Sequence, residues 1–186
     1  MQGWRRKHQR RPFLYMEEKM GKKSIKEDKN VYFTAREDAG LTRAQASELI
    51  GTISESRLEK LETGKTAIVP EDVVDMALAY KKPELCNYYC IHECRIGKDS
   101  VPEVKNASLS EIVLGMLAAL NSLDDQKKRL IDITADGVIS DDELPDFVNI
   151  QKQLDQIDQT VEALKLWVAS TIADGRIDKH KLNSLK

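Results

Sequence analysis

From residue 31 onward, apolar residues recur at the three- and four-residue spacing that is typical of amphipathic helices. No stretch alternates apolar and polar residues with the β-branched enrichment of a strand. Turn signals based on glycine and proline divide this part of the chain. They fall at Gly40, Gly51, Gly64, Pro70, Pro83, Gly97 and Gly137. The pattern therefore predicts an all-α fold.

The turn signals separate two groups of helices. Residues 31–97 hold short, closely spaced ones, whereas residues 108–186 hold two long ones joined near residues 136–141. Between them, residues 98–107 form a predicted linker. We expect an N-terminal bundle of about five helices, followed by a long antiparallel helical hairpin for dimerisation or sensing.

The N-terminal bundle carries clear helix-capping signals. Thr42 and Gln45 have the spacing of a capping box, and Ser54 is the expected cap of the next helix, which turns Leu58 and Leu61 inward. Pro70 suits the first turn of a fourth helix. The apolar residues of that helix are Val73, Val74, Ala77 and Leu78. Two short helices joined by a glycine-bearing turn form a helix-turn-helix bundle.

Three strings carry a resemblance to a known family. Residues 35–42 read Ala-Arg-Glu-Asp-Ala-Gly-Leu-Thr, residues 44–51 contain the next helix, and residues 58–65 read Leu-Glu-Lys-Leu-Glu-Thr-Gly-Lys. They resemble the Cro and phage-repressor (XRE) helix-turn-helix family over about residues 31–85. The resemblance implies a sequence-specific DNA-binding transcriptional regulator. It also implies an ion pair between Arg36 and Glu62.

In that family the second of the paired helices lies in the major groove. The resemblance therefore assigns base contacts to the helix after Ser54, with Arg57 suited to guanine and Glu55 to the N4 amine of cytosine. It assigns phosphate contacts to helix ends and nearby cations. The candidate residues are Thr42, Arg43, Glu55, Ser56, Arg57, Lys60 and Lys65. The alternative is that these are ordinary charges on a solvated helix face.

The net charge of −2 hides a gradient along the chain. Residues 1–30 hold ten Lys/Arg against four Asp/Glu, whereas residues 31–97 hold eight against eleven and residues 98–186 eleven against sixteen. A basic arm, which we expect to be disordered, on an acidic body is typical of nucleic-acid contact. An upstream extension is equally compatible, since Met16 and Met20 are plausible starts. The acidic body itself favours an alternative function, a protein-interaction adaptor on a helix-turn-helix scaffold.

The three cysteines and one histidine lie within nine residues, at Cys86, Cys90, His92 and Cys94. Three cysteines and a histidine are a legitimate structural zinc set, although zinc binding requires the helix to unwind near Ile91. The competing interpretation is that the thiols act as small buried apolar groups. No second histidine lies nearby to activate a thiol, and no nucleophile, base and orienting group converge, so we expect no enzyme.

Residues 132–143 fit the template of an EF-hand calcium loop, from Asp132 to Glu143. A helix joint explains the same residues: Asp136-Gly137 ends one helix, Ile139 packs, and Ser140 with Glu143 caps the next. We favour the joint, and a calcium-responsive regulator remains the further alternative.

The last long helix carries a heptad seam over three repeats. Its members are Phe147, Ile150, Leu154, Ile157, Val161, Leu164 and Val168. A coiled-coil seam of this kind serves either the hairpin or a second subunit, and we expect a homodimer. With no signal-peptide core and no long apolar run, the sequence predicts a cytoplasmic protein without a membrane partner.

Overall fold

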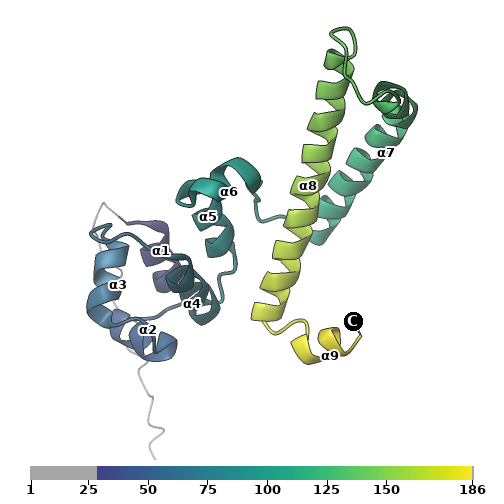
Figure 1. Cartoon of the computed structure of the whole chain (residues 1–186). Coiled ribbons are helices and arrows are strands. Elements are labelled where there is room, and N and C mark those ends of the chain that lie inside the picture. The colour runs from purple at the N-terminus through teal and green to yellow at the C-terminus, as the bar shows by residue number, and fades with distance from the viewer. Residues whose placement is uncertain (1–28, 186) are drawn as a thin grey trace, which may run out of the picture.

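The computed structural model describes residues 29–185, and over this range the chain is helical with no strand, which confirms the all-α prediction (Figure 1). None of these helices combines the length and apolar character needed to cross a bilayer. The helices are α1 (Val31–Asp38), α2 (Arg43–Ile50), α3 (Glu55–Glu62), α4 (Pro70–Tyr80), α5 (Glu84–His92), α6 (Arg95–Ser100), α7 (Leu109–Thr134), α8 (Leu144–Ala173) and α9 (Lys179–Ser184).

Helices α1–α5 enclose one apolar core, and α6 packs on α5. The centre of this apolar core is formed by side chains with essentially no exposed surface, among them Ala46, Leu58 and Met76. Leu58 and Leu61 point inward as the sequence predicts. Of the apolar residues on α4, Val73 and Ala77 are buried, whereas Val74 and Leu78 are 48% and 72% exposed. The inner face of α4 is instead completed by Met76 and Tyr80.

The predicted caps of the bundle are confirmed. In the capping box, the Gln45 amide donates to Thr42 Oγ1 (3.2 Å) and the Thr42 amide donates to Gln45 Oε1 (2.9 Å). Ser54 Oγ accepts from the Arg57 amide, and Pro70 is the first residue of α4. Gly51 ends α2 with φ +76°, a conformation that disfavours any residue with a Cβ atom.

The turn between α2 and α3, residues 51–54, is anchored to the core and to α4. Ile53 inserts into the core with 2% of its surface exposed. Its carbonyl accepts a hydrogen bond from Ser47 Oγ (2.7 Å), and Thr52 Oγ1 donates to Asp75 Oδ2 on α4 (2.5 Å). The buried Ile53 and these two hydrogen bonds thus hold the turn in place where α3 begins.

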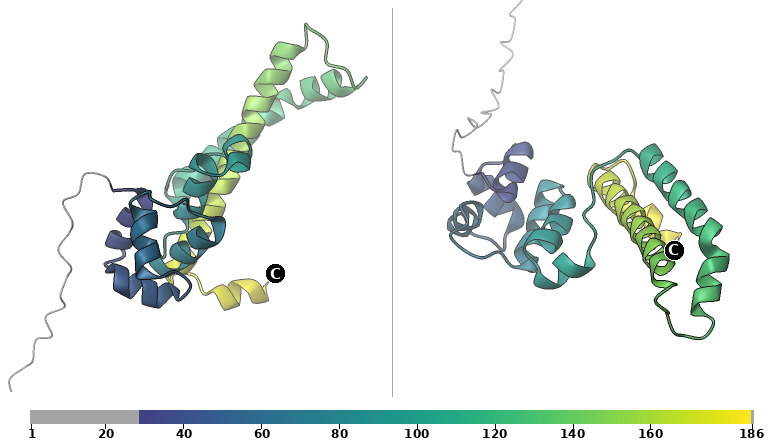
Figure 2. Two further views of the ribbon diagram at one scale, coloured as in Figure 1. Left: turned by 60° about the vertical axis from the view of Figure 1, so that its left-hand side comes forward. Right: turned by 90° about the horizontal axis from the view of Figure 1, so that it is seen from above.

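Helices α7 and α8 pack against each other as an antiparallel hairpin, which extends beyond the N-terminal bundle (Figures 1 and 2). Ile112, Ala119 and Ile133 of α7 and Ile150 of α8 are its most buried apolar residues. Leu154, a member of the predicted seam, is 46% exposed.

The predicted linker, residues 98–107, begins inside α6, which ends at Ser100. The connection that follows is attached to α5 by one side chain. Asn87 Nδ2 donates to the carbonyl of Pro102 (3.0 Å), and the amide of Val104 donates to Asn87 Oδ1 (3.2 Å). On the other side, Gln159 Nε2 of α8 donates to the carbonyl of Glu103. The connection is therefore held by both halves of the structure.

The ion pair implied by the resemblance is present and buried. Arg36 Nη2 lies 3.0 Å from Glu62 Oε2, and the two residues are only 5% and 2% exposed. Arg36 Nη1 also donates to the carbonyl of Leu41 (2.7 Å). Burial lowers the pKa of Arg36, but its hydrogen bond and attraction to Glu62 outweigh this and raise it. A second guanidinium, from Arg43, reaches the same carboxylate, with Nε 2.7 Å from Oε2.

Removal of the Glu62 carboxylate should be the most damaging single change to the bundle. It leaves the Arg36 charge buried without its counterion, which typically costs about 3–5 kcal/mol. We expect Glu62→Ala to lower the free energy of unfolding by about that amount in urea titrations. Glu59→Ala, an exposed glutamate on the same helix, is the matched control and should change stability by less than about 0.5 kcal/mol. Equal effects of the two variants would contradict this account.

Two glycines in helices should respond to alanine in opposite directions. A Cβ at Gly97 would overlap the backbone carbonyl of Cys90, so Gly97→Ala should destabilise the protein by about 1–3 kcal/mol. A Cβ at Gly115 meets only Thr160 Cγ2, at 3.5 Å, so Gly115→Ala should stabilise α7 by up to about 1 kcal/mol. Thermal unfolding of both variants checks the sign of each change.

Candidate nucleic-acid interface

The face of α3 that points away from the core holds most of the predicted base-contacting residues. Glu55, Ser56 and Lys60 are exposed, and Arg57 is partly buried. The cap at Ser54 and the buried pair Leu58 and Leu61 hold this face outward. The structure therefore brings the four residues together on the first turns of one helix.

Arg57 is held by a carboxylate of the following helix. Its Nη2 lies 2.6 Å from Asp72 Oδ2 and its Nε lies 3.3 Å from Oδ1, a two-pronged contact. The hydrogen bond and the attraction to Asp72 raise the pKa of Arg57. Asp72 also accepts a hydrogen bond from the amide of Val69 at the start of α4. Arg57 thus has a structural partner on α4 in addition to any external one.

The predicted phosphate contacts come before and after α3 in the chain. Thr42 is exposed at the start of α2, and Lys65 is exposed just after α3. Arg43 is the first residue of α2, and its guanidinium is paired with Glu62. The basic arm at residues 5–11, which we expect to add phosphate contacts, lies outside the described residues.

The surface around α3 has few positive charges that are not already paired with a carboxylate. Among the described residues near α3, Lys60 and Lys65 form no ion pair, whereas Arg43 and Arg57 each have a carboxylate partner. Exposed glutamates are also present, Glu48 on α2 and Glu55 and Glu59 on α3. Because phosphate neutralisation supplies much of the affinity for DNA, this balance makes each remaining cation important.

Sequence reasoning did not find Asp72 or the double role of Glu62. Asp72 occupies the third position of α4, three residues after Val69, which is a recognisable helix-start signal. That spacing gives no indication of Arg57 on another helix. The Arg43–Glu62 contact likewise joins two helices, so only the tertiary structure identifies it.

The cysteine residues are partly buried free thiols on consecutive helices. Cys86 and Cys90 lie on α5, and Cys94 caps α6 by accepting a hydrogen bond from the amide of Gly97. His92 is exposed and its ring contacts Tyr88 in a tilted arrangement, with ring centroids 4.4 Å apart and an interplanar angle of 49°. No group of three or more potential ligands in the described residues is arranged to hold a metal ion. The zinc site stays a prediction without geometric support.

The loop at residues 132–143 forms a helix joint. Helix α7 ends at Thr134, the amide of Val138 donates to Asp136 Oδ1 (3.0 Å), and the amide of Ser140 donates to Glu143 Oε2 (3.0 Å). These bonds engage one oxygen each of Asp136 and Glu143, two of the residues in the calcium-loop template. Ile139 is 39% exposed, so the packing expected of it is only partial. Calcium binding itself stays an open prediction.

The thiols of α5 should react slowly in the folded protein. Burial raises the pKa of Cys86, and burial with the neighbouring Cys94 raises that of Cys90. A raised pKa leaves less thiolate at pH 8, so iodoacetamide should modify both residues more slowly than in the urea-unfolded chain. Peptide mapping after timed quenching gives the rates. Protection that appears only with added zinc, and is reversed by a chelator, would instead favour the metal site.

The comparisons with known proteins agree with this geometry. Residues 34–84 match the family model described as a helix-turn-helix domain, which belongs to the Cro/C1-type group. No curated protein and no solved structure matches the chain significantly. The matched range covers α2, α3 and α4 and the last five of the eight residues of α1. The match identifies residues 34–84 as similar to a helix-turn-helix domain of this group, which supports a DNA-binding regulator at a coarse level.

Proposed function

We propose that the protein is a sequence-specific DNA-binding transcriptional regulator that inserts the first turns of α3 into the major groove. The observation that carries the proposal is the helix-turn-helix match over residues 34–84, together with an α3 whose polar face is exposed. Helices presented in this way read base edges with their N-terminal residues. We place this activity in the cytoplasm and assign no enzymatic step to it.

Arg57 and Glu55 are the proposed base-reading residues, for guanine and for cytosine respectively. The side chain of Arg57 is 40% exposed, so its guanidinium can reach a base edge once it releases Asp72. This exchange replaces one charge-assisted pair by another. Thr42, Arg43 and Lys65 are the proposed phosphate contacts, which position the domain without reading sequence.

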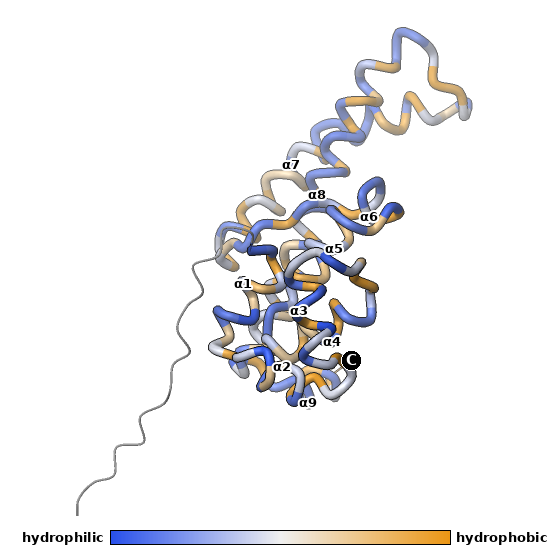
Figure 3. The backbone as a smooth tube through the Cα atoms, turned by 90° about the vertical axis from the view of Figure 1, so that its left-hand side faces the viewer, coloured by the Kyte–Doolittle hydropathy of each residue, from blue (hydrophilic) through white to orange (hydrophobic). Residues whose placement is uncertain are grey.

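We propose that the protein acts as a homodimer formed by the hairpin. Leu109, Val113, Leu117 and Leu120 recur at four- and three-residue spacing on α7 and are 39–52% exposed. On a helical projection this stripe lies beside the buried residues that face α8. Figure 3 shows apolar residues along the hairpin beyond the N-terminal bundle. A contiguous exposed stripe is typical of a protein interface, and two DNA-binding domains suit a two-fold operator.

The charge balance supports a second candidate, the protein-interaction adaptor. The arginines around α3 are paired with carboxylates, and exposed glutamates accompany the two unpaired lysines. An acidic face of this kind suits a basic protein partner better than DNA. The two candidates differ in whether α3 selects a DNA sequence, which is directly measurable.

Selection of bound fragments from random duplex DNA at two salt concentrations should return an enriched sequence. On that sequence, Arg57→Ala should cost about 1–3 kcal/mol and relax the preference at one base pair. Because Arg57 also pairs with Asp72, the matched variant is Asp72→Asn, which frees the arginine without removing it. A base-reading Arg57 predicts that Asp72→Asn keeps sequence preference, whereas a purely structural one predicts similar losses in both variants.

Lys65→Ala should weaken binding to all sequences about equally and reduce the salt dependence by about one charge. Lys152→Ala, an exposed lysine on α8, is the control and should bind as the parent does. If selection at low salt returns no enriched sequence, and Arg57→Ala binds DNA as the parent does, the adaptor replaces the regulator.

Disruption of the α7 stripe should separate the subunits. Leu117→Glu places a charge in the proposed interface and should weaken dimerisation by about 2 kcal/mol or more, roughly 30-fold. Leu114→Glu is the matched control, since Leu114 is 67% exposed on another side of α7. Sedimentation equilibrium measures both dissociation constants, and a monomeric parent protein would contradict the proposal.

A further inference from the structure

Two adjoining cavities lie where the N-terminal bundle meets the C-terminal end of α8. The larger one, of about 480 Å³, is bounded by α4 and the start of α5 on one side and by α8 on the other. Leu78 and Val74, the two apolar residues of α4 that are not in the core, line it. Opposite them stand Ala169, Ile172 and Ala173.

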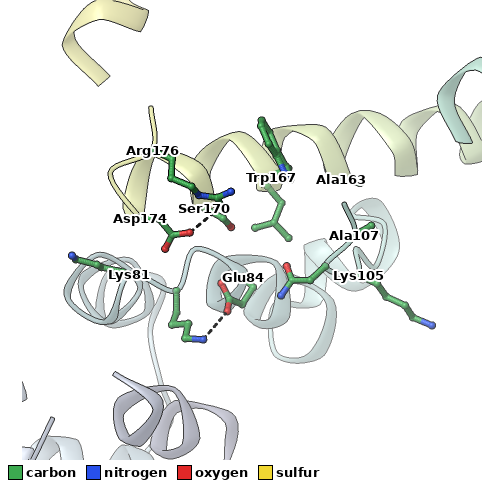
Figure 4. Close-up of a pocket in the computed structure, with 12 residues that line it drawn as sticks. Lys81, Glu84, Lys105, Ala107, Ala163, Trp167, Ser170, Asp174 and Arg176 are labelled. Atoms are coloured by element: carbon green, nitrogen blue, oxygen red, sulfur yellow. Dashed lines mark hydrogen bonds and ion pairs between the residues drawn. The ribbon is translucent and has the colours of Figure 1, made fainter. Parts of the chain in front are cut away.

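The smaller cavity, of about 290 Å³, is polar. Figure 4 shows Lys81 and Glu84 on one side of it and Ser170, Asp174 and Arg176 on the other. Lys81 lines both cavities, so it stands at the junction of the apolar and polar parts. We call the two cavities together the junction groove.

The junction groove has an excess of positive charge. Its two carboxylates are already paired, Glu84 with Lys82 (3.6 Å) and Asp174 with Arg176 (3.0 Å). Lys81 and Lys179, at the edge of the apolar part, form no ion pair within residues 29–185. An apolar wall that ends at unpaired ammonium groups is complementary to a molecule with an apolar body and one negative end.

The size of the apolar part favours a small molecule over a protein segment. One turn of an α-helix with its side chains fills about 500 Å³, so this part has room for a single turn at most. Cavities of about 300–1,000 Å³ are the usual size for small ligands.

We propose that the junction groove binds one amphipathic carboxylate, such as an acyl chain with a free carboxyl end. Its tail lies between Leu78 of α4 and Ile172 of α8, and its carboxylate lies against Lys81. Because the two walls belong to different halves of the chain, the bound molecule fixes their relative placement. Any effect of the bound carboxylate on DNA binding rests on the function proposed above, whereas binding of the carboxylate to the junction groove does not.

The test uses decanoate with the full chain in the absence of DNA. Trp167 lines the polar cavity, so its fluorescence in a Trp4→Phe background reports on the groove, and calorimetry gives the stoichiometry. We expect saturable binding of one decanoate per chain. Decanol, which lacks the charge, and inorganic phosphate, which lacks the tail, should each bind at least about tenfold more weakly.

Two variants probe the two ends of the ligand. Lys81 has φ +57°, and asparagine tolerates this left-handed conformation, so Lys81→Asn removes the charge with little backbone strain. Leu78→Asp places a carboxylate on the apolar wall at a residue already 72% exposed. Each should weaken decanoate binding by about tenfold or more, whereas the controls Lys152→Asn and Leu114→Asp should leave it unchanged.

Other outcomes would overturn the proposal. Decanoate affinity that is equal in the parent and in both groove variants would place binding elsewhere, as on the exposed stripe of α7. If phosphate binds as tightly as decanoate, the groove recognises only the negative charge and not an apolar tail. A dimer that Leu78→Asp dissociates, with no effect of decanoate, would make a second copy of the chain the occupant.

Discussion

The carboxylate of Glu62 is the point on which the N-terminal bundle depends. It receives Arg36 from α1 and Arg43 from α2, while its own helix is α3, so one buried anion fixes three helices relative to each other. The ring of Phe33 lies beneath both guanidinium groups, with centroid distances of 4.9 and 5.9 Å. Two cations around one anion compensate for the loss of hydration that its burial entails. The orientation of the outward face of α3 follows from this arrangement.

The same use of arginine in the fold constrains what the domain can do on DNA. Arg43 and Arg57 each contribute to holding helices together, so their charges are partly neutralised before any nucleic acid arrives. The specific DNA recognition proposed for this domain then depends on geometry more than on a strong positive field. The net negative charge of the whole chain points in the same direction.

The sequence predicts local features well and long-range contacts poorly. The caps at Thr42 and Ser54 were predictable because a capping box is a local pattern, and the Arg36–Glu62 pair was predictable only through the family resemblance. The Arg57–Asp72 contact joins separate helices through side chains, which periodicity does not encode. Leu78 follows the apolar period of α4, yet it faces the junction groove, because spacing alone does not identify what covers a helix face.

The two hydrogen bonds of Asn87 bear on how the halves of the molecule communicate. They immobilise the backbone at residues 102 and 104, so the freely rotating part of the connection shrinks to the few residues before Leu109. The four residues 105–108 span at most about 13 Å when fully extended, so they limit how far the start of α7 can move from residue 104. Because Gln159 of α8 binds the carbonyl of Glu103 between these two contacts, a displacement of the hairpin pulls on a segment that is also fastened to α5.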